Sequence, residues 1–209
     1  LLEEPPSYPV VDRGLQHTIV FLQRHASSGM APPHKINHHA NIRALADQNV
    51  DGIIASTCVG TLVASFPPGR VGLAGQYMDF TGVPVTFNEA RAKFTSVTQP
   101  FDRNLNKQLE KTLRRLQDLD DVRLTYTYWL STGPQYETEA EVNCIDRNGG
   151  EVCGFTMPRE AKVGSTASCR FAACHDHIHV LLTWPPGSLR MPPAAMCGAG
   201  NSVRSAPRG

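Results

Sequence analysis

The sequence predicts a single α/β domain, and three observations support this. The chain has 209 residues, 41% of them apolar and 19% charged, as in a soluble globular domain with a substantial core. Apolar, β-branched stretches at 17–23 and 51–60 flank a segment at 37–50 whose apolar residues have helical spacing. A strand, a helix and a strand in succession indicate a mainly parallel sheet covered by helices.

Local signals define the elements in order. The strand at 17–23 is followed by a loop rich in Gly, Ser and Pro at 26–34, and Asn37 is the expected N-cap of the helix at 37–50. Further strands are predicted at 70–80, 122–130 and 152–157, and further helices at 102–119, 137–149 and 158–169.

The helix at 102–119 has the clearest pattern. A leucine stripe is expected to face the core, with Asp102 as N-cap; it comprises Leu105, Leu109, Leu113 and Leu116. After residue 174 the periodicity is lost, apart from an apolar run at 178–184. We therefore predict a folded domain over 1–174 and a divergent, poorly ordered tail over 175–209.

Composition argues against several classes of protein. The net charge is +1 and the basic residues form no run, which gives no support for nucleic-acid binding. No segment approaches the roughly 18 apolar residues of a membrane helix, and the first residues do not resemble a signal peptide. Six Cys without a CxxC spacing favour free thiols and a cytoplasmic, reducing compartment.

Two strand ends carry groups that suit an anion. Arg24 and His25 follow the first predicted strand, where a guanidinium fork and an imidazole offer donors to phosphate oxygens. The small hydroxyl residues at 56–61 follow the next strand and are suited to an anion-binding turn. The alternatives are a surface pair and an ordinary strand-to-helix turn.

Other segments suggest a planar ligand or a metal. After a strand and a Gly-Pro bend, Tyr136 is suited to stacking on a purine and Glu137 to accepting its ring N–H groups, although Glu137 also suits the first turn of a helix. His177 and His179 alternate on one strand, but they lack a third ligand cluster, so no metal site is expected. His38 and His39 are expected to be a capping or surface pair.

A set of motifs resembles one known family in order and spacing. The motifs are FLQRH, PPHKINHHANIRAL, IIASTCVGTL, QYMDF, TGPQYETEAE and GFTMPREA. Over residues 17 to 174 they resemble the purine nucleoside phosphorylase and methylthioadenosine phosphorylase family. The resemblance implies a mixed, partly barrel-like sheet flanked by helices, and a homotrimer with its active sites near subunit contacts.

The resemblance also implies roles for individual residues. Phosphate would be held by Arg24, His25, Thr57, Cys58 and Thr156. Tyr136 would face the sugar and base, Phe155 would pack under the ribose and Glu137 would read the purine edge. Phosphate would be a co-substrate, and no cofactor is implied.

The implied reaction is the reversible phosphorolysis of a purine nucleoside to a free purine and ribose 1-phosphate, or its 5-methylthio relative. The preferred nucleoside stays open, because Glu137 resembles the 6-oxopurine branch and PPHKINHHAN resembles the methylthio branch.

The sequence departs from the family pattern at three places. The glycine-rich phosphate loop expected before the first strand is missing, and Ala26 and Gly29 stand where Gly and His are usual. HDHIHVLLTWPPG occupies the place of the strand whose Asp or Asn serves purine N7, which makes Asp176 the candidate catalytic residue. The alternative is an inactive family member that acts as a nucleoside- or phosphate-binding or subunit-interaction protein.

Overall fold

The computed structural model describes residues 20–25, 31–48, 50–90, 92–120, 122–166 and 177–183. In chain order the elements are η1 (Pro33–Lys35), α1 (His38–Asp47), β1 (Ile53–Thr61), β2 (Val71–Asp79), α2 (Arg103–Gln117), β3 (Thr125–Leu130), α3 (Glu139–Arg147), β4 (Val152–Gly154), α4 (Met157–Thr166) and β5 (His177–Thr183).

The five strands form a closed barrel in the order β1-β4-β3-β2-β5. The pairs β1/β5, β2/β3 and β3/β4 are parallel, whereas β1/β4 and β2/β5 are antiparallel. The prediction of a mixed, barrel-like sheet in an α/β domain is confirmed. The prediction of a mainly parallel sheet agrees with three of the five strand pairs, and the two antiparallel pairs make the sheet mixed.

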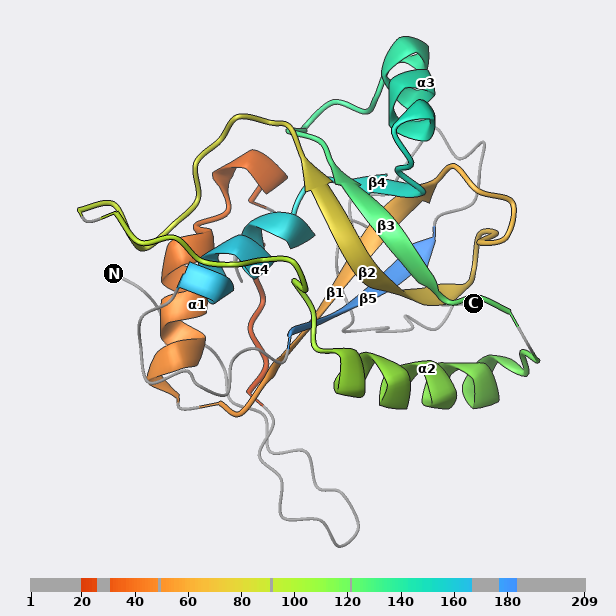
Figure 1. Cartoon of the computed structure of the whole chain (residues 1–209), viewed down its shortest axis with the longest axis horizontal. Helices are drawn as coiled ribbons and strands as arrows, with labels where there is room; N and C mark the ends of the chain where they lie inside the picture. Colours follow the sequence, from red (N-terminus) through yellow and green to blue (C-terminus); the bar gives the residue numbers. More distant parts are fainter. Residues whose placement is uncertain are drawn as a thin grey trace, which may run out of the picture.

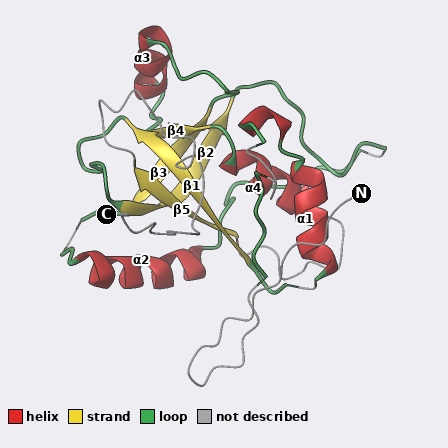
Figure 2. Cartoon of the chain, turned by 180° about the vertical axis from the view of Figure 1, so that it is seen from behind, coloured by secondary structure: helices red, strands yellow, loops and turns green. Residues whose placement is uncertain are grey.

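The helices cover three different parts of the barrel. Figure 1 shows α1 and α4 together on one side, α2 across one end and α3 beyond the other end, and the reverse view in Figure 2 shows the same arrangement. Lys162 of α4 forms an ion pair with Asp79 at the end of β2, and this pair fastens the helix to the sheet.

Strand periodicity builds the core. In β3 the side chains of Tyr126, Tyr128 and Leu130 are buried and alternate with half-buried ones, as expected when successive residues point to opposite faces. Phe66 stacks on Tyr126 with ring centroids 4.4 Å apart, and Met157 of α4 joins the same cluster. The core therefore lies between β3 and α4, beside the strand ends that carry the predicted site.

Side-chain caps set the starts of three helices. Asn37 Oδ1 accepts a hydrogen bond from the Ala40 amide at 3.0 Å, and Asp102 Oδ1 accepts one from the Leu105 amide at 2.6 Å, so both predicted caps are confirmed. Thr138 and Glu141 form a capping box at α3. The prediction that the leucine stripe of α2 faces the core is only partly confirmed, because Leu116, at the helix end farthest from the N-cap, is 72% exposed.

Two other predicted strands differ from the structure. Of the strand expected at 17–23, residues 17–19 lie outside the described residues, Val20 forms an isolated bridge and 21–23 are irregular. β4 ends at Gly154 rather than at residue 157, because α4 already begins at Met157.

The segment predicted to be a tail contains one element of the barrel. β5 pairs with β1 from Ile53↔His177 to Val59↔Thr183, and with β2 on its other side. It coincides with the apolar run at 178–184. Within the described residues, no helix is both long and apolar enough to span a membrane.

Candidate functional site

Arg24 connects two elements at one edge of the barrel. Its Nη2 donates a hydrogen bond to the Ser56 carbonyl of β1 at 2.7 Å, and its Nη1 lies 3.5 Å from Glu160 Oε1 on α4. Only 13% of the side chain is exposed. The guanidinium is thereby fixed beside residues 56–61, which were predicted to form an anion-binding turn after the strand but lie within β1 (Ile53–Thr61).

Two buried hydroxyl groups meet next to Arg24. Thr57 Oγ1 and Thr156 Oγ1 lie 3.3 Å apart, although the residues are 99 positions apart in the chain. Thr57 follows Ser56 on β1, and Thr156 lies in the turn between β4 and α4. Burial raises the pKa of the neighbouring Cys58 thiol, against the opposing effect of Arg24, so this thiol contributes no negative charge at neutral pH.

His25 is also buried, and its hydrogen bond fixes its tautomer. Its Nδ1–H donates to the Ala31 carbonyl at 2.8 Å. Burial is the main cause that lowers the pKa of His25, and the charge of Arg24 acts in the same direction. In the neutral ring Nε2 is then an acceptor, so His25 donates to a phosphate oxygen only when it is protonated.

The residues predicted to contact sugar and base lie in a second cluster. The rings of Tyr136 and Phe155 are 5.9 Å apart at 38°, and Ser131 Oγ donates a short hydrogen bond to Glu137 Oε1. Gly133 has φ +65°, and a Cβ there would come within 3.0 Å of the Phe155 ring. A glycine at this bend therefore permits both the turn and the close approach of the aromatic ring.

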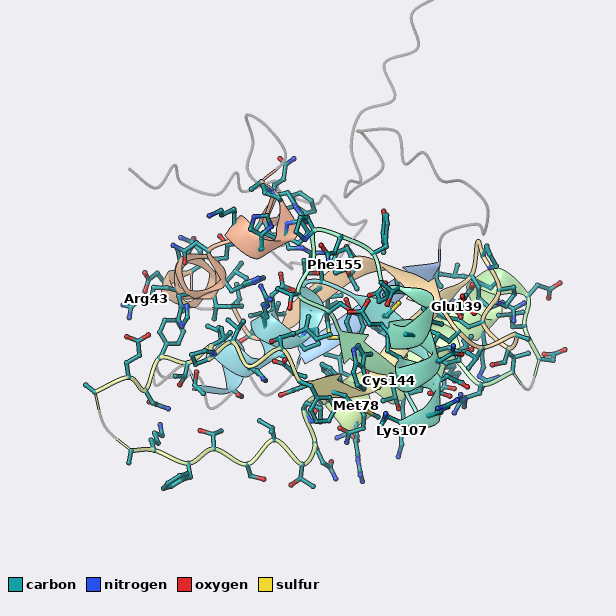
Figure 3. The ribbon with its side chains drawn as sticks, turned by 90° about the horizontal axis from the view of Figure 1, so that it is seen from above. Arg43, Met78, Lys107, Glu139, Cys144 and Phe155 are labelled. Atoms are coloured by element: carbon teal, nitrogen blue, oxygen red, sulfur yellow. The ribbon has the colours of Figure 1, made fainter. Side chains whose placement is uncertain are left out.

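A pocket of about 390 Å³ opens beside this cluster. Its lining includes Phe80 and Trp129, with ring centroids 5.1 Å apart, together with Ser131, Tyr136 and Glu137. Cys144 of α3 also lines it, and Figure 3 labels both this residue and Phe155. Aromatic walls with carboxylates, those of Glu137 and Glu141, suit a planar heteroaromatic ring that offers N–H donors.

One turn joins the two clusters. Phe155 contacts Tyr136, while the next residue, Thr156, contacts Thr57. Cys153, in the middle of β4, lies in the same region, and burial and the nearby Glu137 raise the pKa of its thiol to about 12. The structure thus brings the anion-directed and ring-directed residues together.

Two buried residues of the site were not predicted. Glu160 and His38 are 8% and 5% exposed, and His38 Nδ1 lies 3.9 Å from Glu160 Oε1. The expectation that His38 and His39 form a capping or surface pair is wrong: α1 packs on α4, which buries His38, and His39 Nε2 donates to the Thr86 carbonyl at 2.8 Å. The sequence signal that could have identified Glu160 as a buried residue of the site is the acidic position within the otherwise largely apolar motif GFTMPREA.

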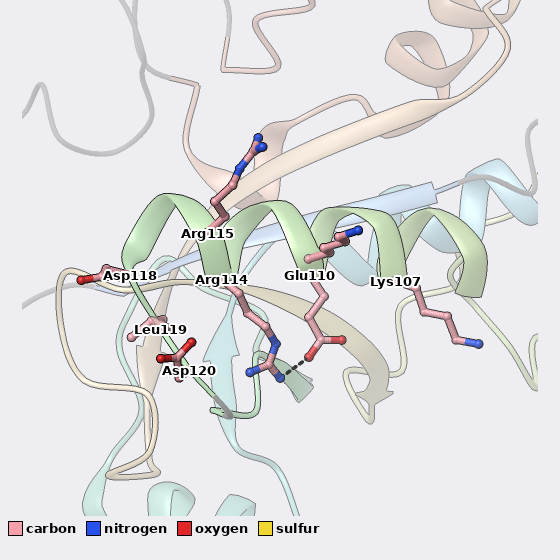
Figure 4. A pocket seen from close by; sticks show the side chains of 8 residues that line it. Lys107, Glu110, Arg114, Arg115, Asp118, Leu119 and Asp120 are labelled. Carbon is pink, nitrogen blue, oxygen red and sulfur yellow. Dashed lines mark hydrogen bonds and ion pairs between the residues drawn. The ribbon is translucent and has the colours of Figure 1, made fainter.

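The remaining candidates fall outside the residues or side chains that the structure describes. Asp176 is outside the described residues, as are the side chains of His177 and His179. Among the side chains that are described, no three His, Cys, Asp or Glu residues are grouped as metal ligands. A separate hollow of about 690 Å³ lies along α2, lined by charged residues such as Lys107 and Glu110 (Figure 4), and it contains none of the predicted site residues.

Comparison with known proteins agrees with this geometry. The probable 6-oxopurine nucleoside phosphorylase of Thermococcus kodakarensis is 34% identical over 168 residues, which are 74% of this chain and 61% of that protein. The S-methyl-5'-thioadenosine phosphorylase of Hyperthermus butylicus is 34% identical over 172 residues, covering 81% and 62%. This chain spans about three fifths of the length of the curated relatives it matches.

A solved structure has a similar fold. The methylthioadenosine phosphorylase from Schistosoma mansoni in its apo form aligns with a TM-score of 0.71 at 20% identity, over 83% of this chain and 67% of that one. The family model of the phosphorylase superfamily matches residues 7–175. The chain therefore belongs to the phosphorylase superfamily, in the family of the purine nucleoside and methylthioadenosine phosphorylases.

Proposed function

We propose that this protein catalyses the reversible phosphorolysis of a purine nucleoside, of the inosine or guanosine type or of the 5'-methylthioadenosine type. The products are a free purine and ribose 1-phosphate or its 5-methylthio relative. The observation that supports this most is the turn at Phe155 and Thr156, since it joins an aromatic pocket with a carboxylate to a cluster of one guanidinium and two hydroxyl groups.

The reaction needs phosphate and nucleoside in fixed mutual orientation. A phosphate oxygen attacks the anomeric carbon as the bond to the purine breaks, and the bonding electron pair leaves with the purine. Arg24, Thr57 and Thr156 would donate to the remaining phosphate oxygens. Positioning and charge stabilisation then supply most of the rate enhancement.

The departing purine needs recognition and a proton. Glu137 would accept a hydrogen bond from a purine ring N–H, and its hydrogen bond from Ser131 fixes the carboxylate toward the pocket. Protonation at N7 would neutralise the leaving group, and Asp176 remains the candidate donor. Both substrate branches stay in the proposal, since relatives named for 6-oxopurine nucleosides and for methylthioadenosine have the same 34% identity.

The assembly and location of the protein are part of the same proposal. We infer a homotrimer in the cytoplasm that takes a purine nucleoside and phosphate and needs no cofactor. The exposed Tyr136, at 61%, beside the buried anion-directed cluster, where Thr156 is 4% exposed, supports a site completed near a subunit contact. Size-exclusion chromatography with light scattering tests the trimer.

The first experiment measures phosphate-dependent release of purine from inosine, guanosine and methylthioadenosine. We expect turnover on at least one of them that is abolished without phosphate, and a loss of about 100-fold in kcat/KM for phosphate in Arg24→Met. Arg43→Met is the matched control, because Arg43 pairs with Asp47 on the exposed side of α1 and is labelled far from Phe155 in Figure 3.

The outcomes separate the two hypotheses. Binding of phosphate or nucleoside in calorimetry without turnover would support the inactive binding protein. Absence of both turnover and binding would refute the proposal.

A further inference from the structure

Glu160 is a buried carboxylate that the proposed reaction does not use. It lies in the first turn of α4, is 8% exposed, and its Oε2 accepts no hydrogen bond within the described part of the chain. A buried carboxylate is costly unless a counter-charge lies nearby. The guanidinium within ion-pair distance is that of Arg24, at 3.5 Å from Oε1.

Contacts with two elements define the orientation of Arg24. Nη2 donates to the Ser56 carbonyl of β1, and Nη1 faces Glu160 of α4. A guanidinium is a rigid plane, so two contacts at different nitrogens fix both its position and its tilt. Ser56 precedes Thr57, whose hydroxyl lies against Thr156, and the orientation is therefore set relative to the two hydroxyl groups.

Burial raises the pKa of the Glu160 carboxyl and the charge of Arg24 opposes this effect, while two other ionisable groups lie close by. His38 of α1 lies 3.9 Å from Glu160 Oε1, and burial, with the charges of Arg159 and Arg24, lowers its pKa to about 4. It is neutral at physiological pH and does not compete as a cation. Arg159, on the same helix, is also buried, and its charge acts on His38.

We propose that Glu160 is a positioning residue that orients the guanidinium of Arg24 toward the phosphate co-substrate, an inference that rests on the proposed function. Glu160 acts only through Arg24 and does not touch the phosphate. Without its carboxylate, Arg24 keeps the contact of Nη2 with Ser56 but loses the ion pair at Nη1.

The kinetic test is a set of variants in the full chain. Glu160→Gln keeps the shape and removes the charge, and we expect the KM for phosphate to rise about tenfold, with the KM for the nucleoside unchanged. Glu160→Asp retains the charge and should recover part of the loss. In an Arg24→Met background, Glu160→Gln should have little further effect, because the residue it positions is gone.

A matched control comes from α2. Glu110 pairs with Arg114 at 2.8 Å on the helix surface, as the dashed line in Figure 4 shows. Glu110→Gln thus removes a carboxylate from another arginine outside the site, and we expect it to leave the KM for phosphate unchanged. An equal rise in both variants would contradict a specific role for Glu160.

A measurement that needs no turnover separates this inference from the proposed function. In ¹⁵N spectra of the arginine side chains, the signals that vanish in Arg24→Lys are those of Arg24. We expect separate, slowly exchanging Nη signals in the wild type and averaged ones in Glu160→Gln. Unchanged signals in Glu160→Gln would overturn the inference. If they change while the wild type neither binds nor uses inorganic phosphate, Glu160 orients Arg24 but the proposed function is wrong.

Discussion

The imidazole of His38 lies inside the protein, where its charged form is unfavourable. Burial lowers its pKa from 6.5 to about 4, and the arginines and histidines nearby act in the same direction. The unfolded chain therefore binds a proton at this residue at a higher pH than the folded protein does. The stability that the neutral His38 contributes is present above pH 6.5 and is lost as the pH falls toward 4.

This residue gives a prediction for stability against pH. In His38→Phe a ring of similar shape no longer titrates. The free energy of unfolding should therefore fall less between pH 6.5 and 4 than it does in the wild type, and the difference between the two proteins should be at most about 3 kcal/mol. Urea unfolding at several pH values measures it, with exposed His34→Gln as the control. An identical pH dependence in His38→Phe and the wild type would contradict the assignment.

At the residue scale, sequence patterns identified candidate residues that the structure brings together, but not the buried ionisable residues beside them. Arg24, Thr57 and Thr156 were predicted because they follow strand ends or belong to a recognisable motif. Glu160 and His38 were missed, since burial depends on how α1 packs against α4 and no local pattern encodes that contact. The expected donation by His25 also changes, because the Ala31 carbonyl fixes its tautomer.

Helix α2 is attached to the barrel mainly through polar contacts at its two ends. The Gln117 side chain accepts from the Val71 amide at 2.8 Å and donates to the Val71 carbonyl at 2.9 Å, and Asn106 donates to the Ala74 carbonyl at 3.1 Å. No residue of α2 is fully buried. These side-chain amide contacts with β2 therefore help to hold α2 against the barrel, which in other helices is the role of a buried apolar face.

Removal of the Gln117 amide should weaken this attachment. Gln117→Leu leaves the amide and carbonyl of Val71 without these partners, and we expect the free energy of unfolding to fall by about 2 kcal/mol. Gln108→Leu is the matched control on the same helix, because its side chain is exposed. Urea unfolding compares the two variants, and equal losses would show that the bonds to Val71 carry no special weight.

Among the elements, caps were predicted better than strand ends. Asn37 and Asp102 were identified because an N-cap is a local interaction between a side chain and an amide three residues along the chain. The end of β4 was missed because α4 begins directly after Thr156, and the choice between strand and helix there depends on packing against the barrel. Leu116 fits the stripe in spacing but its side chain is exposed, although the next residue, Gln117, contacts β2.

The barrel is closed by its last described strand. β5 lies between β1 and β2, parallel to the first and antiparallel to the second, and Val180 pairs with both Ser56 and Leu73. β1 also carries the carbonyl that holds Arg24 and the hydroxyl of Thr57. Disruption of β5 should therefore affect the site as well as stability.

A proline in β5 tests this dependence. Val180→Pro removes a backbone N–H from a strand with neighbours on both sides, and we expect a loss of at least about 3 kcal/mol and weaker phosphate binding. Val180→Ala, which retains the N–H, should cost clearly less. Thermal unfolding and calorimetry with phosphate report the two effects, and equal behaviour of the variants would argue against a continuous β1-β5-β2 ladder.

At the scale of the molecule, the sequence predicted an α/β domain but not the strand order. The order β1-β4-β3-β2-β5 rests on pairings between distant segments, which local periodicity does not encode. The segment 175–209 was assigned to a tail because the family motifs end before it. β5 lies inside this segment and is defined by its pairing with β1 and β2, which the local sequence does not reveal.

The adjacency of Phe155 and Thr156 has a consequence for how this protein can change. Two side chains on consecutive residues share one peptide unit, so a backbone adjustment that suits a new ring beside Phe155 also displaces the hydroxyl of Thr156 from Thr57. Selectivity for the ring that binds beside Phe155 and affinity for the anion at Thr156 are then not independent of each other. Under the proposed function, a new nucleobase preference at this turn would require compensating substitutions among the residues directed at the anion.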